Sequence, residues 1–280
     1  MRALRTLTCC SLGIVLMLSA TSLRADLAKD IDAGLPIQTI MANAMQEGSR
    51  SNAAIMALLI KKGFNPTQVT SAALKAGVPM EEVVQAALAT GIEMTVVMAA
   101  ATEANINVAK MMEIAVAQGA PIKEVVAATI ASGYTPTAVV SAAVKTGAPI
   151  QTIIAGAMTS GAKVETIIAA SIRSGASPAA VVSAAITAIQ EFRQSSPSAA
   201  GSQEKIAQSI SQVVAAAITA GGNPAAVITS AVAAVPEAKA VIVNSASTAG
   251  VEKSVVQNAV AVGMEQKQKP TVEGTALSPS

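Results

Sequence analysis

Residues 119–147 have the sequence GAPIKEVVAATIASGYTPTAVVSAAVKTG, which contains two consecutive copies of one pattern. A glycine opens each copy and returns after fourteen residues, and two adjacent aliphatic residues follow it at the seventh and eighth positions. A fixed period of this kind is the signature of a repeat protein. The same period places glycines at Gly63, Gly77, Gly91, Gly119, Gly133, Gly147, Gly161 and Gly175, and Asn105 takes the one vacant place.

Each block has the apolar pattern of a short helix. Numbered from the glycine, positions 4, 7, 8 and 12 are apolar and position 11 is small. In the block that starts at Gly119 these residues are Ile122, Val125, Val126, Ile130 and, at position 11, Thr129. Spacings of three and four residues mark one face of an α-helix, whereas the adjacent aliphatic pair contradicts the alternation of a half-buried strand.

The ends of the blocks carry matching helix signals. Four prolines follow an N-capping Ser, Thr or Asn and are expected at the first helical position: Pro66, Pro136, Pro178 and Pro224. Glycine suits the left-handed residue just past a helix end, and Asn105 is an accepted substitute. Because only a short connector separates consecutive helices, we expect them to run antiparallel.

A single block cannot bury enough surface to fold alone, so neighbouring blocks must stack. The sequence therefore predicts an all-α protein, an α-solenoid of about fifteen short antiparallel helices built from a fourteen-residue repeat.

The regular pattern divides the chain into five segments. We expect a signal peptide at 1–25, a solenoid of eleven blocks at 26–188, a polar interruption or hinge at 189–206, a second solenoid of four blocks at 207–263 and a disordered tail at 264–280.

The first segment has the composition of a cleaved secretory signal. Arg2 and Arg5 precede an apolar run that ends in small residues, and cleavage after Ala20 or after Ala25 would satisfy the small-residue requirement. The chain's two cysteines, Cys9 and Cys10, lie within this segment. We therefore expect an exported product without cysteine, in the periplasm or outside the cell.

Composition argues against two classes of partner. Without residues 1–25 the chain has sixteen basic and seventeen acidic residues, a net charge of −1, and no long basic run. Nucleic-acid binding is not expected from such a surface. Helices of about eleven residues are also too short to span a bilayer. An apolar edge at an end block could still make weak peripheral contact with a membrane.

The residues that enzymes use most often are missing. The chain has no histidine, and its cysteines lie in the signal segment, so we expect no enzymatic activity and no catalytic residue. Glu81 and Glu82 are the nearest candidates for a paired acid and base. Neighbouring helix positions point in different directions, however, and acids in a first turn are expected from the helix dipole.

No cofactor-binding or metal-binding residue is predicted either. Four methionines could supply thioether ligands to copper(I): Met94, Met98, Met111 and Met112. They occupy apolar positions of the repeat, which favours a role in the core. Phe64 and Tyr134 follow a closing glycine and are expected to pack over a helix end, the alternative being a contact with a partner. Lys61 and Lys62, with Arg50 upstream, are expected to complement the end of a helix.

Two functions are compatible with this sequence. The first is an exported structural or scaffold repeat protein that binds protein partners or self-associates end to end. The alternative is a solenoid binding module that holds a peptide or an apolar ligand.

Overall fold

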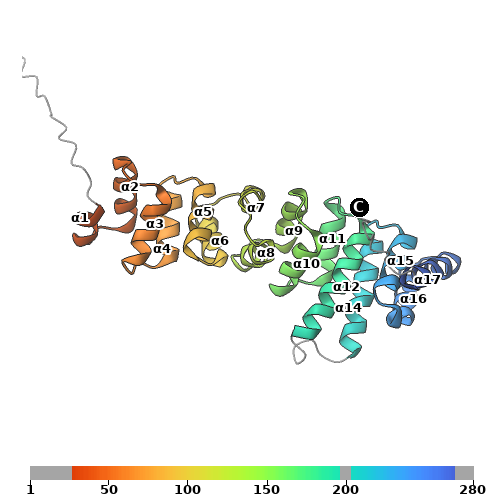
Figure 1. Ribbon diagram of the computed structural model, residues 1–280. Helices are drawn as coiled ribbons and strands as arrows, with labels where there is room; N and C mark the ends of the chain where they lie inside the picture. Colours follow the sequence, from red (N-terminus) through yellow and green to blue (C-terminus); the bar gives the residue numbers. More distant parts are fainter. Residues whose placement is uncertain (1–26, 196–202, 269–280) are drawn as a thin grey trace, which may run out of the picture.

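The computed structural model describes residues 27–195 and 203–268, and within these residues it contains helices and no strand. The predicted all-α solenoid is confirmed. A short first helix, α1 (Leu27–Asp32), is followed by fifteen longer helices that succeed one another along an elongated molecule (Figure 1). The expected signal peptide at 1–25 lies outside the described residues.

The fifteen helices form two rows, because each helix packs mainly on the second helix before it and the second after it. The first row contains α2 (Ile37–Glu47), α4 (Pro66–Lys75), α6 (Met94–Glu103), α8 (Ile122–Ala131), α10 (Ile150–Thr159), α12 (Pro178–Ser195), α15 (Pro224–Ala234) and α17 (Lys253–Gln268). The second row contains α3 (Asn52–Lys61), α5 (Met80–Thr90), α7 (Val108–Ala117), α9 (Pro136–Lys145), α11 (Val164–Arg173), α14 (Gln203–Thr219) and α16 (Lys239–Thr248). A 3-10 turn, η1 (Pro236–Ala238), joins α15 to α16.

The core consists of the aliphatic stripe that the repeat predicts. Val125 and Val126 are fully buried, as is the small residue Thr129 three places later. The hydroxyl of Thr129 donates a 2.7 Å hydrogen bond to the Val125 carbonyl oxygen of its own helix. A polar side chain can therefore stand at this small position without leaving a buried hydroxyl unpaired.

The predicted helix ends are also found. Asn65 accepts hydrogen bonds from the amides of Thr67 and Gln68, and Thr135 and Asn223 cap α9 and α15 in the same way. Asn105 has a φ of 56° and is the one residue other than glycine with a positive φ in the described part of the chain. Most of the regular helices, such as α8 and α9, have ten residues rather than the expected eleven. Because the repeat length is fixed, each connector gains the residue that the helix loses.

Two expectations about irregular segments need correction. Within the proposed interruption at 189–206, residues 189–195 extend α12 and residues 203–206 begin α14. In the tail expected to be disordered, 264–280, α17 continues to Gln268. The added turns lack the repeated aliphatic pair but still contribute apolar side chains, since Ile189 is buried and Ile206 packs against the core.

The stack continues on both sides of the interruption. The helix α14 packs on α11 and α15 packs on α12, as the regular neighbours do. The change of sequence pattern therefore lengthens α12 and α14 but interrupts neither row of helices.

Candidate functional site

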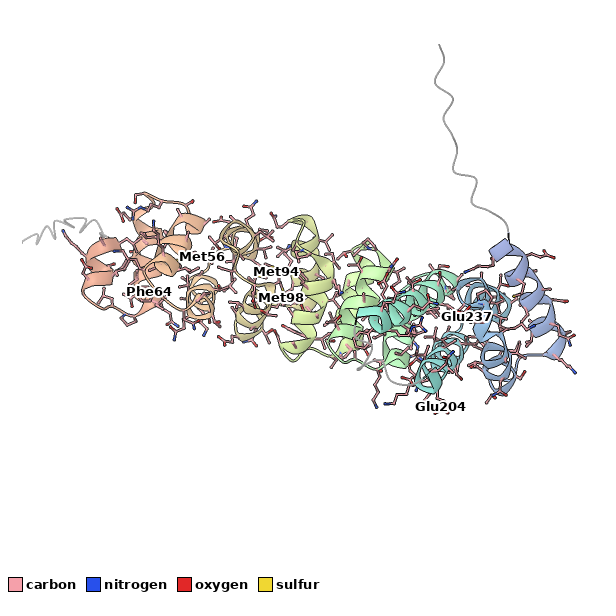
Figure 2. The ribbon with its side chains drawn as sticks, turned by 60° about the horizontal axis from the view of Figure 1, so that its bottom comes forward. Met56, Phe64, Met94, Met98, Glu204 and Glu237 are labelled. Carbon is pink, nitrogen blue, oxygen red and sulfur yellow. The ribbon has the colours of Figure 1, made fainter. Side chains whose placement is uncertain are left out.

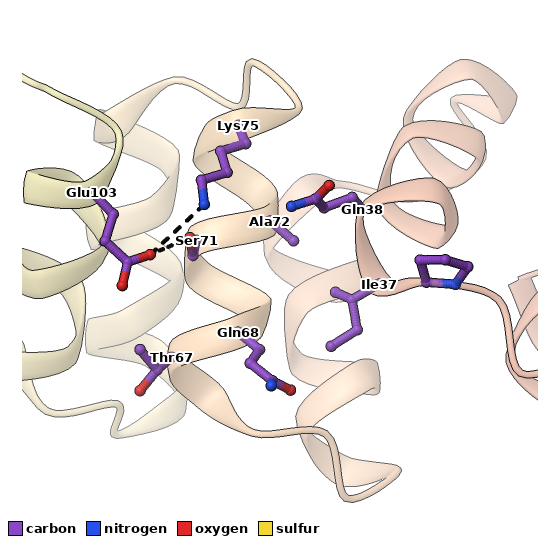
Figure 3. Close-up of a pocket in the computed structure, with 9 residues that line it drawn as sticks. Ile37, Gln38, Thr67, Gln68, Ser71, Ala72, Lys75 and Glu103 are labelled. Carbon is purple, nitrogen blue, oxygen red and sulfur yellow. Dashed lines mark hydrogen bonds and ion pairs between the residues drawn. The ribbon is translucent and has the colours of Figure 1, made fainter.

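An open groove on the first row has a volume of about 560 Å³. It crosses α2, α4 and α6 near the start of the stack (Figure 3). Its lining comprises Pro36, Ile37, Gln38, Thr67, Gln68, Ser71, Ala72, Lys75 and Glu103.

The Glu103 carboxylate organises one side of this groove. The Ser71 hydroxyl donates a hydrogen bond of 2.8 Å to Glu103 Oε2, and Lys75 Nζ lies 3.8 Å from the same oxygen (Figure 3). Ser71 is 7% exposed, whereas the side chains of Lys75 and Glu103 are 45% and 54% exposed. An ion pair so open to solvent contributes little to stability, so the hydrogen bond from the buried hydroxyl is the firmer link between α4 and α6.

The groove offers hydrogen-bonding groups to a ligand, and its Ser71 hydroxyl has no adjacent histidine. A serine nucleophile needs an adjacent base that can take its proton, commonly a histidine, and the sequence contains none. The Ser71 hydroxyl is instead committed to a carboxylate that also faces a lysine. Gln38 and Gln68 add amide donors and acceptors, which match the hydrogen-bonding groups of a peptide backbone.

The first row has a second shallow groove farther along. It has a volume of about 500 Å³ and crosses α6, α8 and the end of α10. Its lining combines the apolar residues Ala127, Ala128 and Ala131 with the acidic residues Glu93 and Glu124. The small residues of the repeat thus leave depressions between neighbouring helices of one row.

Glu81 and Glu82 do not form a paired acid and base. Glu82 accepts a 2.6 Å hydrogen bond from the Asn52 amide on α3, while Glu81 lies 3.6 Å from Lys110 on α7. The two carboxylates therefore face opposite neighbours of α5, as their adjacent helix positions predict.

The four methionines lie in the core, as the repeat positions predict. Met94 is 4% exposed, and Met98, Met111 and Met112 are fully buried; Figure 2 labels Met94 and Met98 within the stack. No group of three or more histidine, cysteine, aspartate or glutamate side chains that could hold a metal ion occurs in residues 27–195 and 203–268.

The two connector aromatics pack against the core. Phe64 and Tyr134 are half-buried, and the Tyr134 hydroxyl donates a 2.6 Å hydrogen bond to the Ile106 carbonyl oxygen. Lys61 lies in the last turn of α3, and Lys62 follows it as the exposed C-cap residue. These positions agree with the expected packing and helix-end roles.

Sequence reasoning missed the Ser71–Glu103 link. The two residues are 32 positions apart and occupy the ninth and thirteenth places of two blocks that are neighbours only within one row. Comparing each block with the second block after it, rather than with the next block, could have identified Ser71 and Glu103 as neighbours.

No helix in the described part of the chain is sufficiently long and apolar to cross a bilayer. No protein-family model matches the sequence, and no curated protein matches it.

Proposed function

We propose that the protein is an exported, non-enzymatic structural or scaffold protein that self-associates through the C-terminal end of its helical stack. The difference between the two ends of the stack is the observation that carries this proposal.

The N-terminal end is covered. The helix α1 packs on α2 and places Leu27, which is 2% exposed, against the first layer. The amide of Asn43 on α2 donates a 2.9 Å hydrogen bond to the Asp30 carboxylate on α1. Asp32 and Lys29 add charge around this helix. A polar, closed end of this kind is what a terminal repeat needs for solubility.

The C-terminal end has an exposed apolar side chain among polar residues. The last helix, α17, packs on α15 and α16, and its Val262 side chain is 46% exposed. Val255, Val260 and Met264 on the same helix are only half-buried. Val255 and Val262 are seven residues apart and lie on one flank of the helix. A second copy that placed its own α17 on this flank would bury both side chains and remove apolar surface from water.

The asymmetry favours a closed pair over a filament. A filament joins different surfaces and would require the charged α1 end to cover the valines of α17. A contact between two identical ends is instead self-complementary and closes after two copies. Export is supported by the sequence of residues 1–25, whose basic start and apolar run are typical of a signal peptide.

Light scattering coupled to size exclusion, at several protein concentrations, tests self-association. The proposal expects a mass that approaches twice that of one chain as concentration rises, and electron microscopy of the same fractions should show rods of limited length. A single-chain mass at every concentration would contradict self-association, and long filaments would contradict the closed pair.

The groove beside Glu103 supports a second candidate, a module that binds an extended peptide. Peptides selected by phage display on the wild-type protein provide the probe. Gln68→Trp fills the groove from an exposed lining position, whereas Gln85→Trp places the same side chain at an exposed position of α5 outside it. Peptide binding should be lost only in Gln68→Trp, and equal binding by both variants would exclude the groove.

A further inference from the structure

The lengthened helices enclose a pocket of about 220 Å³ in the second half of the stack. It lies between α12, α14, η1 and α16, where the fourteen-residue pattern changes. Its lining comprises Gln190, Arg193, Gln203, Ile206, Ala207, Ile210, Val235, Glu237, Ala238 and Val241.

Two departures from the repeat create this pocket. The helices α12 and α14 have 18 and 17 residues, and their added turns supply Gln190, Arg193 and Gln203. The connector after α15 lacks the usual glycine and forms η1, and Glu237 of η1 also lines the pocket. Figure 2 labels Glu237 in this part of the molecule. Regular layers of the stack have neither feature.

The lining has an apolar floor and a charged rim. Ile210 and Val235 are each 3% exposed, and Ile206 and Val241 are half-buried beside them. At the rim, Arg193 and Glu237 are exposed and carry opposite charges. Both residues line the pocket, and no ion pair within 4.0 Å joins their side chains in the described structure.

We propose that this pocket binds a free apolar α-amino acid of about the size of leucine. The Arg193 guanidinium would hold the ligand's carboxylate and the Glu237 carboxylate would hold its ammonium group, each through a charge-assisted hydrogen bond. The aliphatic side chain of the ligand would cover Ile206, Ile210 and Val241. Gln190 and Gln203 can each donate and accept hydrogen bonds at the rim.

The volume agrees with this class of ligand. A cavity of about 150 Å³ holds benzene, which has six heavy atoms. A pocket of about 220 Å³ therefore has room for the four-carbon side chain of leucine or isoleucine, whose charged groups would lie at the rim.

The pair of opposite charges selects a zwitterion. A fatty monocarboxylate would satisfy Arg193 but would bring its charge near Glu237, and an alkylamine would do the reverse. Like charges brought together in this way are unfavourable. Only a ligand with both a carboxylate and an ammonium group can bind Arg193 and Glu237 at the same time.

Titration of the isotope-labelled protein with L-leucine, followed by amide chemical shifts, tests the site. The expected result is saturable shifts at Ile206, Ile210 and Val241. Arg193→Gln and Glu237→Gln should each weaken binding about tenfold, because each removes a charged hydrogen-bonding partner. 4-Methylpentanoate, which lacks the ammonium group, and 3-methylbutylamine, which lacks the carboxylate, should each bind about tenfold more weakly than leucine.

Arg173→Gln and Glu165→Gln are the matched controls, since both positions are exposed on α11 and neither lines the pocket. Both should bind leucine as the wild type does. The absence of saturable shifts up to about 10 mM leucine, which would fill a site of about 1 mM affinity, would overturn the proposal. Equal binding of 4-methylpentanoate with no effect of Glu237→Gln would also overturn it. The inference does not rest on self-association, so either can fail alone.

Discussion

The Tyr134 hydroxyl donates a 2.6 Å hydrogen bond to the carbonyl oxygen of Ile106, 28 residues earlier in the chain. This separation is two fourteen-residue blocks, so the bond joins equivalent connectors of successive layers. Tyr134 precedes α9 and Ile106 precedes α7, and these helices are neighbours in the second row. The Tyr134 side chain therefore joins two successive layers of the stack, which the repeat places 28 residues apart in the sequence.

Tyr134→Phe should lower the free energy of unfolding by about 0.5–1.5 kcal/mol, because it removes this hydrogen bond and keeps the ring. Urea denaturation followed by circular dichroism measures the change. Phe64 stands at the same place of its block without a hydroxyl, so Phe64→Leu is a matched test of ring packing alone. Unchanged stability of Tyr134→Phe would show that solvent replaces the bond.

Val125→Asp should unfold α8 together with its row neighbours. Val125 is fully buried, and a charge without a partner at this position costs about 3 kcal/mol or more. Hydrogen exchange should show lost protection in α6, α8 and α10, since each layer is stabilised by the next.

Lys123→Asp is the control for this variant, because it places the same side chain at an exposed position of the same helix. Its stability should stay within about 0.5 kcal/mol of the wild type. Equal protection in both variants would mean that the seventh position of the block is not part of the core.

Gly156→Ala should destabilise the protein although alanine is the better helix former. A Cβ at this position would lie 2.5 Å from the carbonyl oxygen of Lys123 and 3.0 Å from Val126 Cβ. Overpacking costs about 1–3 kcal/mol, against a gain of about 1 kcal/mol in helix propensity. Thermal unfolding should give a lower melting temperature for Gly156→Ala. A higher melting temperature would show that α8 and α10 can move apart to accept the methyl group without loss of stability.

Asn105→Gly should be neutral or stabilising, whereas Asn105→Ala should lose about 1–2 kcal/mol. The residue has a φ of 56°, which glycine adopts freely and alanine does not. Gly133→Ala, at a φ of 104°, is the matched change in a regular connector and should also destabilise the protein. Equal thermal stability of Asn105→Gly and Asn105→Ala would indicate that this connector can change conformation.

The repeat made most of the fold predictable. Each buried pair such as Val125-Val126 recurs at a fixed place, and the closing glycines and capping residues mark where helices end. The lengths of α12 and α14 were not predictable from the same pattern, because their added turns lack the apolar stripe that identified the other helices.

The candidate sites required the three-dimensional packing. Ser71 and Glu103 meet across one row, and Arg193 and Glu237 line one pocket although they are far apart in the chain. Individually these residues are ordinary polar residues on a helix or connector. Only the stacking of alternate helices shows which of them share a depression.

Val262→Glu tests the proposed contact between C-terminal ends most directly. Gln85→Glu places the same charge at an exposed position of α5, far from the C-terminal end, and is the control. Light scattering at matched concentrations should show the wild type and Gln85→Glu as pairs and Val262→Glu as single chains, because a charge at this apolar surface opposes burial. Pairing by Val262→Glu equal to that of the wild type would contradict association through α17.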